Sequence, residues 1–191
     1  MQPAIAEKGL MVLDITAHGK AGHAARDEGD NAIYHALDDM QWFRTKEWER
    51  VSPLLGKVKT TVTIVNSGTQ HNVIPDQCTF TVDVRSNELY SNQELFQLIC
   101  QEVKSEVKAR SFRLNSSSIS TSHPIVQALT AMGKKPFGSP TLSDQALMPF
   151  PSLKMGPGES CRSHTADEYI LRSEIADAIS TYTSLLQNLV L

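Results

Sequence analysis

The segment HNVIPDQCTFTVDVR, residues 71–85, leads from a turn into a strand and decides the fold of the first half of the chain. In its second part, apolar and polar residues alternate with the period of two that places successive strand side chains on opposite faces of a sheet. One face carries Cys78, Phe80, Val82 and Val84, and the other carries Thr79, Thr81, Asp83 and Arg85. The pattern predicts a strand with one face in a core and Arg85 pointing away from it.

Three further segments around this strand have the composition of strands. Residues 10–17, LMVLDITA, form an apolar run that is followed by a glycine-punctuated loop. Residues 57–65, KVKTTVTIV, alternate, which predicts Val58, Val62 and Ile64 on one side. Residues 109–115, ARSFRLN, predict a fourth strand with Phe112 and Leu114 inward.

Two segments between these strands have helical periodicity. Asp30 is placed to cap a helix over NAIYHALDDMQWFR, whose predicted apolar face consists of Ile33, Ala36, Leu37, Met40 and Phe43. Ser91 and Glu94 form a capping box. The helix that follows them is predicted to present Leu95, Leu98, Ile99, Val103 and Val107.

The resulting order β-α-β-β-α-β, over residues 8–118, is the ferredoxin-like arrangement of an α+β domain. It predicts a four-stranded antiparallel sheet with both helices on one face. The opposite face and the edge strand are then available for a partner.

The rest of the chain, residues 119–191, follows a serine-rich segment and has a different character. Pro124 suits the first turn of a short helix, SLKMG at 152–156 predicts a short strand, and a helix is predicted from Ser173 onward. Two helices and one strand make a poor core by themselves. We therefore expect this segment to be part of a second domain whose other half is absent.

Composition excludes several functional classes. The 191 residues suffice for one large or two small domains, and the formal net charge of −3 argues against a nucleic-acid or anionic-membrane surface. No apolar stretch is long enough to span a membrane. The three cysteines, Cys78, Cys100 and Cys161, form no CxxC pair, which favours a reducing cytoplasm.

The segment GPGESCRSHTADEYI, residues 156–170, places His164 among glycines and small polar residues. A hydrolytic zinc site needs about three protein ligands and a water. The other histidines lack the His-x-Asp spacing, and no Glu-Glu pair occurs in the chain. His164 is therefore either an ordinary loop histidine or one ligand of a site that a larger protein completes.

Four motifs in their order, GKAGHAARDEGDNAI, HNVIPDQCTFTVDVR, TLSD and GPGESCRSHTADEY, resemble the acetylornithine deacetylase and succinyl-diaminopimelate desuccinylase family of dinuclear zinc amidohydrolases. The resemblance covers nearly the whole chain. It implies that residues 8–118 are the lid and dimerisation domain and that residues 119–191 are the C-terminal part of an α/β zinc-peptidase-like catalytic domain. In that family the other metal ligands precede the lid. Two zinc or cobalt ions are thus expected in the full-length enzyme, and no stoichiometric metal in this chain.

The same resemblance implies roles for four residues. His164 matches the metal-binding histidine near the C-terminus. His23 matches the lid histidine that reaches into the partner subunit's site and donates to the scissile carbonyl oxygen. Asn72 and Arg85 match positions that bind the carboxylate end of the substrate, although Asn72 could equally close a turn.

Other residues of the motifs carry further expectations. Glu168 could orient the imidazole of His164 or simply begin the next element, Asp144 lies near the substrate end in the family, and Gly156 and Gly158 would permit close backbone approach. No function is assigned to four histidines, His18, His35, His71 and His123, or to the cysteines.

The expected activity is removal of an acyl group from the α-amino nitrogen of an amino acid, most like acetylornithine deacetylation in arginine biosynthesis. The expected assembly is a cytoplasmic homodimer formed through the lid. Two alternatives stay open at this point. The chain could be a non-catalytic dimerisation or ligand-binding module, or the substrate could be a succinylated amino acid or a dipeptide.

Overall fold

The computed structural model describes residues 1–189 and divides into two compact units. The larger unit is Lys8–Ser116, and the smaller unit combines Met1–Glu7 with Ser117–Leu191. The last two residues of the predicted second segment, 190 and 191, lie outside the described residues. The N-terminal seven residues, which the sequence patterns left unassigned, are thus part of the smaller unit.

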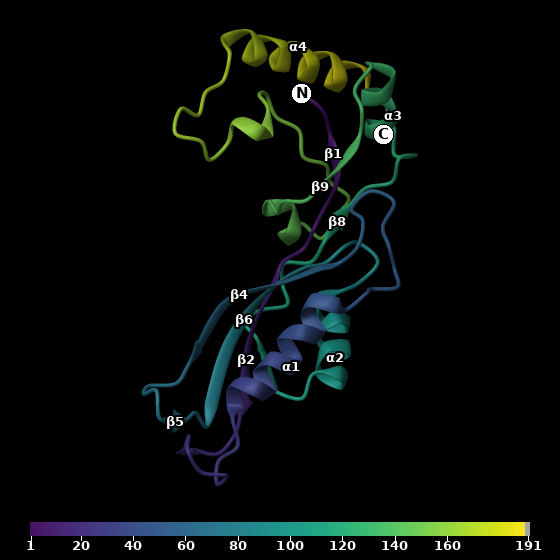
Figure 1. Ribbon diagram of the computed structural model, residues 1–191. Coiled ribbons are helices and arrows are strands. Elements are labelled where there is room, and N and C mark those ends of the chain that lie inside the picture. The colour runs from purple at the N-terminus through teal and green to yellow at the C-terminus, as the bar shows by residue number, and fades with distance from the viewer. Residues whose placement is uncertain (190–191) are drawn as a thin grey trace. The chain divides into compact units, whose positions relative to one another are not determined.

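The larger unit contains one four-stranded sheet with the order β4-β6-β2-β7. Its strands are β2 (Met11–His18), β4 (Lys59–Ser67), β6 (Gln77–Arg85) and β7 (Glu106–Ala109), and all neighbours are antiparallel. The helices α1 (Ala32–Thr45) and α2 (Asn92–Glu102) lie together on one face (Figure 1). The predicted ferredoxin-like α+β fold is confirmed.

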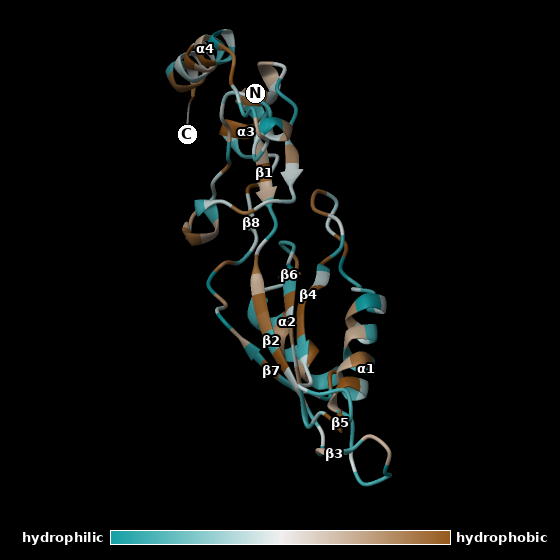
Figure 2. Ribbon diagram, turned by 60° about the vertical axis from the view of Figure 1, so that its left-hand side comes forward, coloured by the Kyte–Doolittle hydropathy of each residue, from teal (hydrophilic) through white to brown (hydrophobic). Residues whose placement is uncertain are grey.

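The core of the larger unit lies between this sheet and the two helices. The inward faces of the two central strands consist of Met11, Leu13, Ile15, Ala17, Cys78, Phe80, Val82 and Val84, all of which are buried. Figure 2 shows brown, apolar residues along these strands. Phe43 of α1 meets Phe80 edge-on, with 6.2 Å between ring centroids, so helix and sheet are joined by aromatic as well as aliphatic contacts.

Helix α1 begins one residue later and faces the sheet differently from the prediction. Asn31 is its N-cap and accepts a hydrogen bond from the backbone N–H of Ile33 at 3.0 Å. Asp30 instead contacts His35 at 2.6 Å. The buried side consists of Ala32, Ala36, Asp39 and Phe43, whereas Ile33 and Leu37 are exposed. The predicted apolar face was therefore wrong at these two positions.

The buried carboxylate of Asp39 explains where the next helix stops. It accepts hydrogen bonds from the backbone N–H groups of Lys104 and Ser105, at 3.1 and 3.0 Å. The chain turns there, so α2 ends at Glu102 and Val107 lies in β7 instead of on the helix. The predicted strand at 109–115 was displaced for the same reason.

In the larger unit, the predicted cap of α2 is confirmed and the predicted alternation of β4 is interrupted. Ser91 accepts from the N–H of Glu94 at 3.1 Å, as the capping box predicts. In β4 the pairing with β6 shifts register between Val62 and Ile64. This bulge interrupts the alternation, and Ile64 is exposed instead of sharing the inward side with Val58 and Val62.

The smaller unit contains a three-stranded sheet with the order β8-β1-β9. Its elements are β1 (Ala4–Glu7), β8 (Ser117–Ser118), α3 (Pro124–Ala131), β9 (Phe137–Ser139), the 3-10 helices η1 (Asp144–Leu147) and η2 (Ser160–Arg162), and α4 (Arg172–Asn188). Pro124 begins α3, as predicted. The predicted strand at 152–156 forms only a single bridge, between Lys154 and Ala4.

No helix among residues 1–189 is both long and apolar enough to cross a membrane.

The role of Asp39 in ending α2 can be tested by substitution. Asp39→Ala leaves two half-buried N–H groups without their acceptor, so the free energy of unfolding of the larger unit should fall by about 1 to 3 kcal/mol. The neighbouring exposed residue provides a matched control, since Asp38→Ala should change it by less than about 0.5 kcal/mol. Urea unfolding followed by tryptophan fluorescence measures this unit, because both tryptophans, Trp42 and Trp48, belong to it.

Candidate functional site

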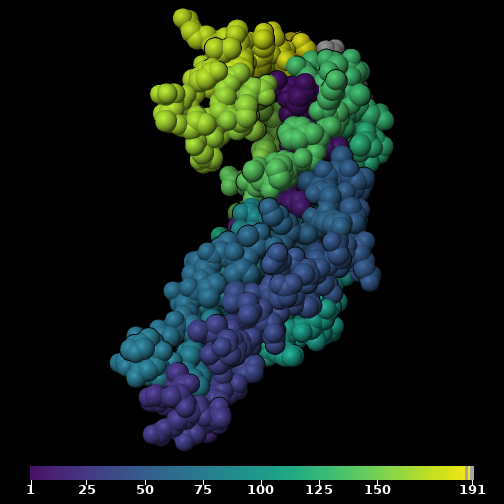
Figure 3. All heavy atoms as spheres, viewed as in Figure 1, coloured from purple at the N-terminus to yellow at the C-terminus, as the bar shows by residue number. Residues whose placement is uncertain are grey.

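His23 and Asn72 are brought together by a small pair of strands. Strand β3 (Gly22–His23) is antiparallel to β5 (Val73–Ile74), with His23 opposite Val73. The N–H of Ala24 donates to the carbonyl oxygen of Asn72 at 2.9 Å. The pair lies at the end of the larger unit where β2 ends and β6 begins, and it protrudes there together with the loop that leads to α1 (Figures 1 and 3).

The contact of the His23 ring with the backbone indicates which of its two nitrogens carries the hydrogen when the ring is neutral. Its Nδ1 accepts a hydrogen bond from the N–H of Ala25 at 3.1 Å. A neutral imidazole that accepts at Nδ1 carries its proton on Nε2. Because the side chain is exposed, Nε2 can donate a hydrogen bond to a group outside the loop.

Glycines let the loop that carries His23 close on itself. Lys20 and Asp30 exchange two backbone hydrogen bonds, at 2.8 and 2.9 Å. A Cβ atom on Gly22 would lie 2.9 Å from the backbone of Gly29. Real Cβ atoms do not approach so closely, so the loop depends on glycine at this position.

Arg85 lies at the other end of β6, far from His23. The strand spans nine residues, which separates its ends by about 27 Å. The Arg85 guanidinium donates to both carboxylate oxygens of Asp83, at 2.7 and 3.0 Å. The structure therefore brings His23 and Asn72 together and leaves Arg85 apart from them, paired with an acid on its own strand.

His164 lies in the exposed segment between η2 and α4. Its backbone φ is 61°, and its backbone N–H donates to the carboxylate of Glu168 at 3.0 Å. Glu168 thus binds the main chain of His164, whereas the sequence left open whether it contacts the imidazole or simply begins the next element. Nearby, Gly158 has a φ of 86°, a backbone conformation that favours glycine. A Cβ atom on Gly156 would meet nothing within 4 Å, so no close approach requires glycine there.

The described residues offer only a part of a metal centre. Among residues 1–189, no group of three or more His, Cys, Asp or Glu side chains is placed to hold a metal ion. The imidazole of His164 is exposed and chemically suited as one ligand, against the three or so that a hydrolytic zinc needs. These residues fit a metal site as one contributor and not as a complete set.

The segment around His164 is fastened by an ion pair that the sequence patterns did not predict. Arg162 donates from Nη1 to both carboxylate oxygens of Glu174, at 2.9 and 2.7 Å. The N–H of Leu171 and the Arg162 guanidinium lower the pKa of Glu174. The ionised form therefore stabilises this segment above the ordinary carboxyl pKa of about 4.3. That stabilisation is lost as the pH falls through the lower pKa of the folded state.

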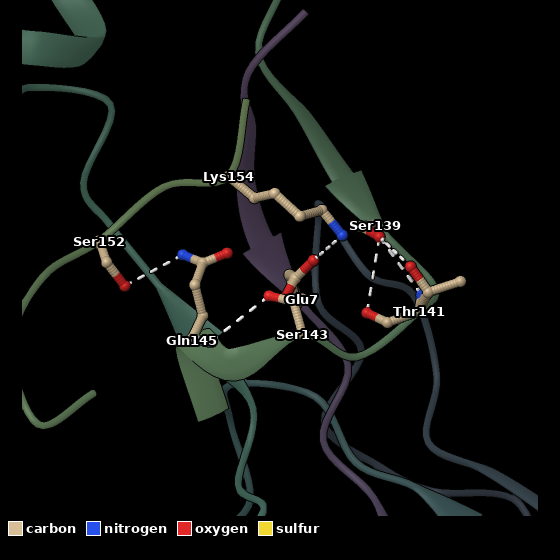
Figure 4. A network of polar contacts seen from close by, with 7 residues as sticks. All are labelled: Glu7, Ser139, Thr141, Ser143, Gln145, Ser152 and Lys154. Atoms are coloured by element: carbon tan, nitrogen blue, oxygen red, sulfur yellow. Dashed lines mark hydrogen bonds and ion pairs between the residues drawn. The ribbon is translucent and has the colours of Figure 1, made fainter. Parts of the chain in front are cut away.

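A buried polar network lies elsewhere in the smaller unit (Figure 4). Glu7 of β1 is 1% exposed and contacts the ammonium of Lys154 and the hydroxyl of Ser143. Gln145 donates to Ser152 at 3.0 Å. Glu7 is far in sequence from Ser143 and Lys154, so no local pattern could have predicted these contacts. Asp144 of the TLSD motif is exposed, between the half-buried Ser143 and the buried Gln145.

Three histidines that received no functional assignment have structural contacts. His18 contacts Glu106 at 3.4 Å, and His35 contacts Asp30 at 2.6 Å. His123 is the N-cap of α3, where its Nδ1 accepts from the N–H of Ile125 at 3.3 Å. Each ring is thereby explained by local structure.

Comparison with known families defines the class of the chain. The sequence profile of the peptidase dimerisation domain of the M20 family matches residues 5–111. The chain therefore belongs to the M20 peptidase family, whose members are hydrolases. The matched range includes all but the first residue of β1 and the whole sheet of the larger unit.

Individual relatives agree with this assignment. The chain is 27% identical over 200 residues to a protein of Aeropyrum pernix named as a LysW-lysine/LysW-ornithine hydrolase, covering 96% of this chain and 53% of that protein. The structure is similar to aminopeptidase PepT of Bacillus cereus, with a TM-score of 0.71, 16% identity and coverage of 96% and 52%. It is also similar to an M20 family metallo-carboxypeptidase of Sulfolobus solfataricus, with a TM-score of 0.64, 15% identity and coverage of 97% and 59%. The chain thus spans little more than half of these relatives.

The dependence of the His23 loop on glycine gives a prediction. Gly22→Ala should force the loop away from Gly29, so the amide of Ala24 should exchange its hydrogen at least about tenfold faster, equivalent to about 1.4 kcal/mol of local stability. Amide hydrogen exchange monitored by NMR measures this. Gly156→Ala is the control, because its Cβ meets no atom within 4 Å, and it should leave the exchange at Ala24 unchanged.

Proposed function

We propose that the protein containing this chain is a metal-dependent hydrolase that releases an amino acid from its N-acyl form, most like acetylornithine deacetylase. The observation that carries the proposal is the exposed His23, whose Nε2–H is set as a donor by the contact of Nδ1 with Ala25. Membership of the M20 family supports a hydrolase.

The site residues of the chain would act on different parts of the substrate. His23 would donate to the carbonyl oxygen of the scissile amide as negative charge develops there, which is the role of an oxyanion-hole donor. Asn72 and Arg85 would bind the carboxylate end of the amino acid. Asp83 occupies two donor directions of Arg85, and a guanidinium has five N–H groups, so donors are left for a substrate carboxylate.

The metal would be held only in part by this chain. His164 would supply one ligand, and the remaining ligands would come from outside the described residues. When bound, two zinc or cobalt ions supply a water of lowered pKa as the nucleophile.

A single protomer cannot present His23 and Arg85 to one small substrate, because about 27 Å of strand separates them. A homodimer resolves this, since His23 and Asn72 of one subunit can reach the site to which Arg85 of the other belongs. We therefore propose that each site is built from two subunits.

The surface that forms this homodimer is proposed to include the edge of the sheet and the outer side of α1. Strand β4 is an edge strand, and its Ile64 and Val65 are 51% and 50% exposed. Helix α1 exposes Ile33, Tyr34 and Leu37. Exposed apolar side chains beside unpaired strand edges are typical of interfaces.

The substrate is proposed to be an N-acyl derivative of ornithine or a similar basic amino acid, in cytoplasmic arginine biosynthesis. Support comes from the Aeropyrum pernix relative, whose name describes hydrolysis of LysW-linked lysine and ornithine. In both cases the amino acid has a basic side chain.

The proposed role of His23 is tested in the complete enzyme. His23→Ala should lower kcat about a hundredfold, the usual effect of removing one oxyanion donor, with acetylornithine as substrate. His71→Ala, in the turn beside Asn72, should change kcat by less than about threefold and controls for damage to this end of the sheet. Equal kcat values for His23→Ala and His71→Ala would contradict the proposed role of His23 as an oxyanion donor.

The proposed dimer surface gives a separate prediction. Val65→Lys places a charge on the edge strand and should convert the dimer to a monomer at micromolar concentration, as measured by light scattering with size exclusion. Val51→Lys is a matched control, because Val51 is also 50% exposed and lies outside β4 and α1. A dimer that persists in the first variant, or dissociates equally in both, would contradict this surface.

A further inference from the structure

The turn that carries His164 has an unusual backbone. His164 is the single non-glycine residue with positive φ between residues 1 and 189, at 61°. This left-handed conformation is uncommon for residues with a Cβ and persists where surrounding contacts enforce it. Such positions concentrate at functional sites, and here the residue is the proposed metal ligand.

Arg162 supplies the first of the enforcing contacts. Its guanidinium binds both carboxylate oxygens of Glu174, at 2.9 and 2.7 Å, and lies over the ring of Tyr169, 4.8 Å from its centroid. Both partners of the ion pair are only 21% exposed in their side chains. A half-buried pair with two short contacts and an aromatic neighbour holds a more defined geometry than an exposed pair.

The other contacts close the segment around His164 from both directions. Glu174 also accepts from the N–H of Leu171 at 2.9 Å, which joins the end of the segment to the first turn of α4. Thr165 donates to the carbonyl oxygen of Arg162 at 2.8 Å. Tyr182, farther along α4, donates to the carbonyl oxygen of Met155 at 2.5 Å. Residues 155 and 171, which lie on either side of His164, are therefore both hydrogen-bonded to side chains of α4.

Glu168 completes the arrangement through the main chain of His164. Its carboxylate accepts from the N–H of His164 at 3.0 Å. That contact, with the Arg162–Glu174 pair, accounts for a left-handed residue in an exposed segment that has no strand or long helix of its own.

We propose that Arg162, Glu168 and Glu174 are positioning residues, which hold the turn of His164 in the conformation that presents its imidazole to the metal. This inference rests on the proposed function, in which His164 is a metal ligand. Ligands held in place before the metal arrives lose less conformational freedom on binding. These three residues should therefore raise the affinity for the metal without contacting the ion.

The experiment uses the complete protein and two measurements. Zinc affinity is determined by competition with a chromogenic chelator, and the visible absorption of the cobalt-loaded protein reports the geometry around the ion. Arg162→Ala should weaken zinc binding by about 10- to 100-fold, the range found for residues that orient ligands, and alter the cobalt spectrum. Arg162→Lys retains the charge but not the two short contacts, and should have an intermediate effect.

Arg110→Ala is the matched control. Arg110 donates to both oxygens of Asp14, at 2.8 and 2.9 Å, so it forms the same kind of pair in the larger unit. Its loss should leave zinc affinity and the cobalt spectrum unchanged. An equal effect of Arg110→Ala and Arg162→Ala would show a general loss of stability and overturn the proposal.

Hydrogen exchange at the amides of His164 and Leu171 in the 191-residue chain separates the positioning role of Arg162, Glu168 and Glu174 from the assignment of His164 as a metal ligand. Arg162→Ala and Glu168→Ala should both accelerate exchange at His164, and Glu168→Gln, which keeps an acceptor oxygen, should have a smaller effect. Faster exchange with unchanged zinc affinity would overturn the positioning role. Normal zinc affinity in His164→Ala would instead overturn the assignment of His164 as a ligand, and the inference with it.

If Arg162→Ala fails to fold in the complete protein, Arg162→Lys and Glu168→Ala still decide the question. Both keep the segment's other contacts. Unchanged zinc affinity in both variants would refute the proposal, and a graded loss in the order of their exchange rates would support it.

Discussion

The antiparallel pairing of β2 with β6 is the constraint on which the larger unit depends. It runs without interruption from Met11 opposite Val84 to His18 opposite Gln77. Because side chains alternate along both strands, this register buries four apolar residues from each strand and turns the polar ones outward. The same pairing sets the position of each end of the sheet. It therefore determines both the packing of the core and the positions of the residues at the strand ends.

The proposed site residues of the larger unit are placed by the ends of this pairing. At the end where His18 meets Gln77, the chain continues into the loop of His23 and emerges from the turn of Asn72. At the other end lies Arg85. A ferredoxin-like sheet of this length separates residues that a small substrate would have to contact together, which is why the proposed site requires a second subunit.

Much of this fold could be predicted from the sequence, because its central strands alternate strictly and β6 is buried on one face only. The errors at the end of α2 and in the following strand occurred where a buried polar group overrode the apolar pattern. Asp39 occupies a position on the inner side of α1 and ends α2 by binding backbone N–H groups, and no local pattern predicts such a long-range contact. Strand β1 was missed since four residues are too few to establish a period.

The candidate site was predictable to a smaller extent. The Asp83–Arg85 pair could have been foreseen, because residues two apart on a strand share a face. The contact of His23 with Ala25, which sets its proton, depends on loop geometry that sequence periodicity does not contain. The Arg162–Glu174 pair joins a 3-10 helix to the start of α4, and only the folded segment brings these residues into contact.

The uninterrupted register of β2 and β6 also limits how sequences of this kind can diverge in length. An insertion or deletion of one residue inside β6 would exchange its two faces, moving Arg85 into the apolar layer and Val84 into water. Gains and losses of residues should therefore accumulate among homologues in the connections at 46–57 and 68–72. The central strands should keep a constant number of residues even where their identities change.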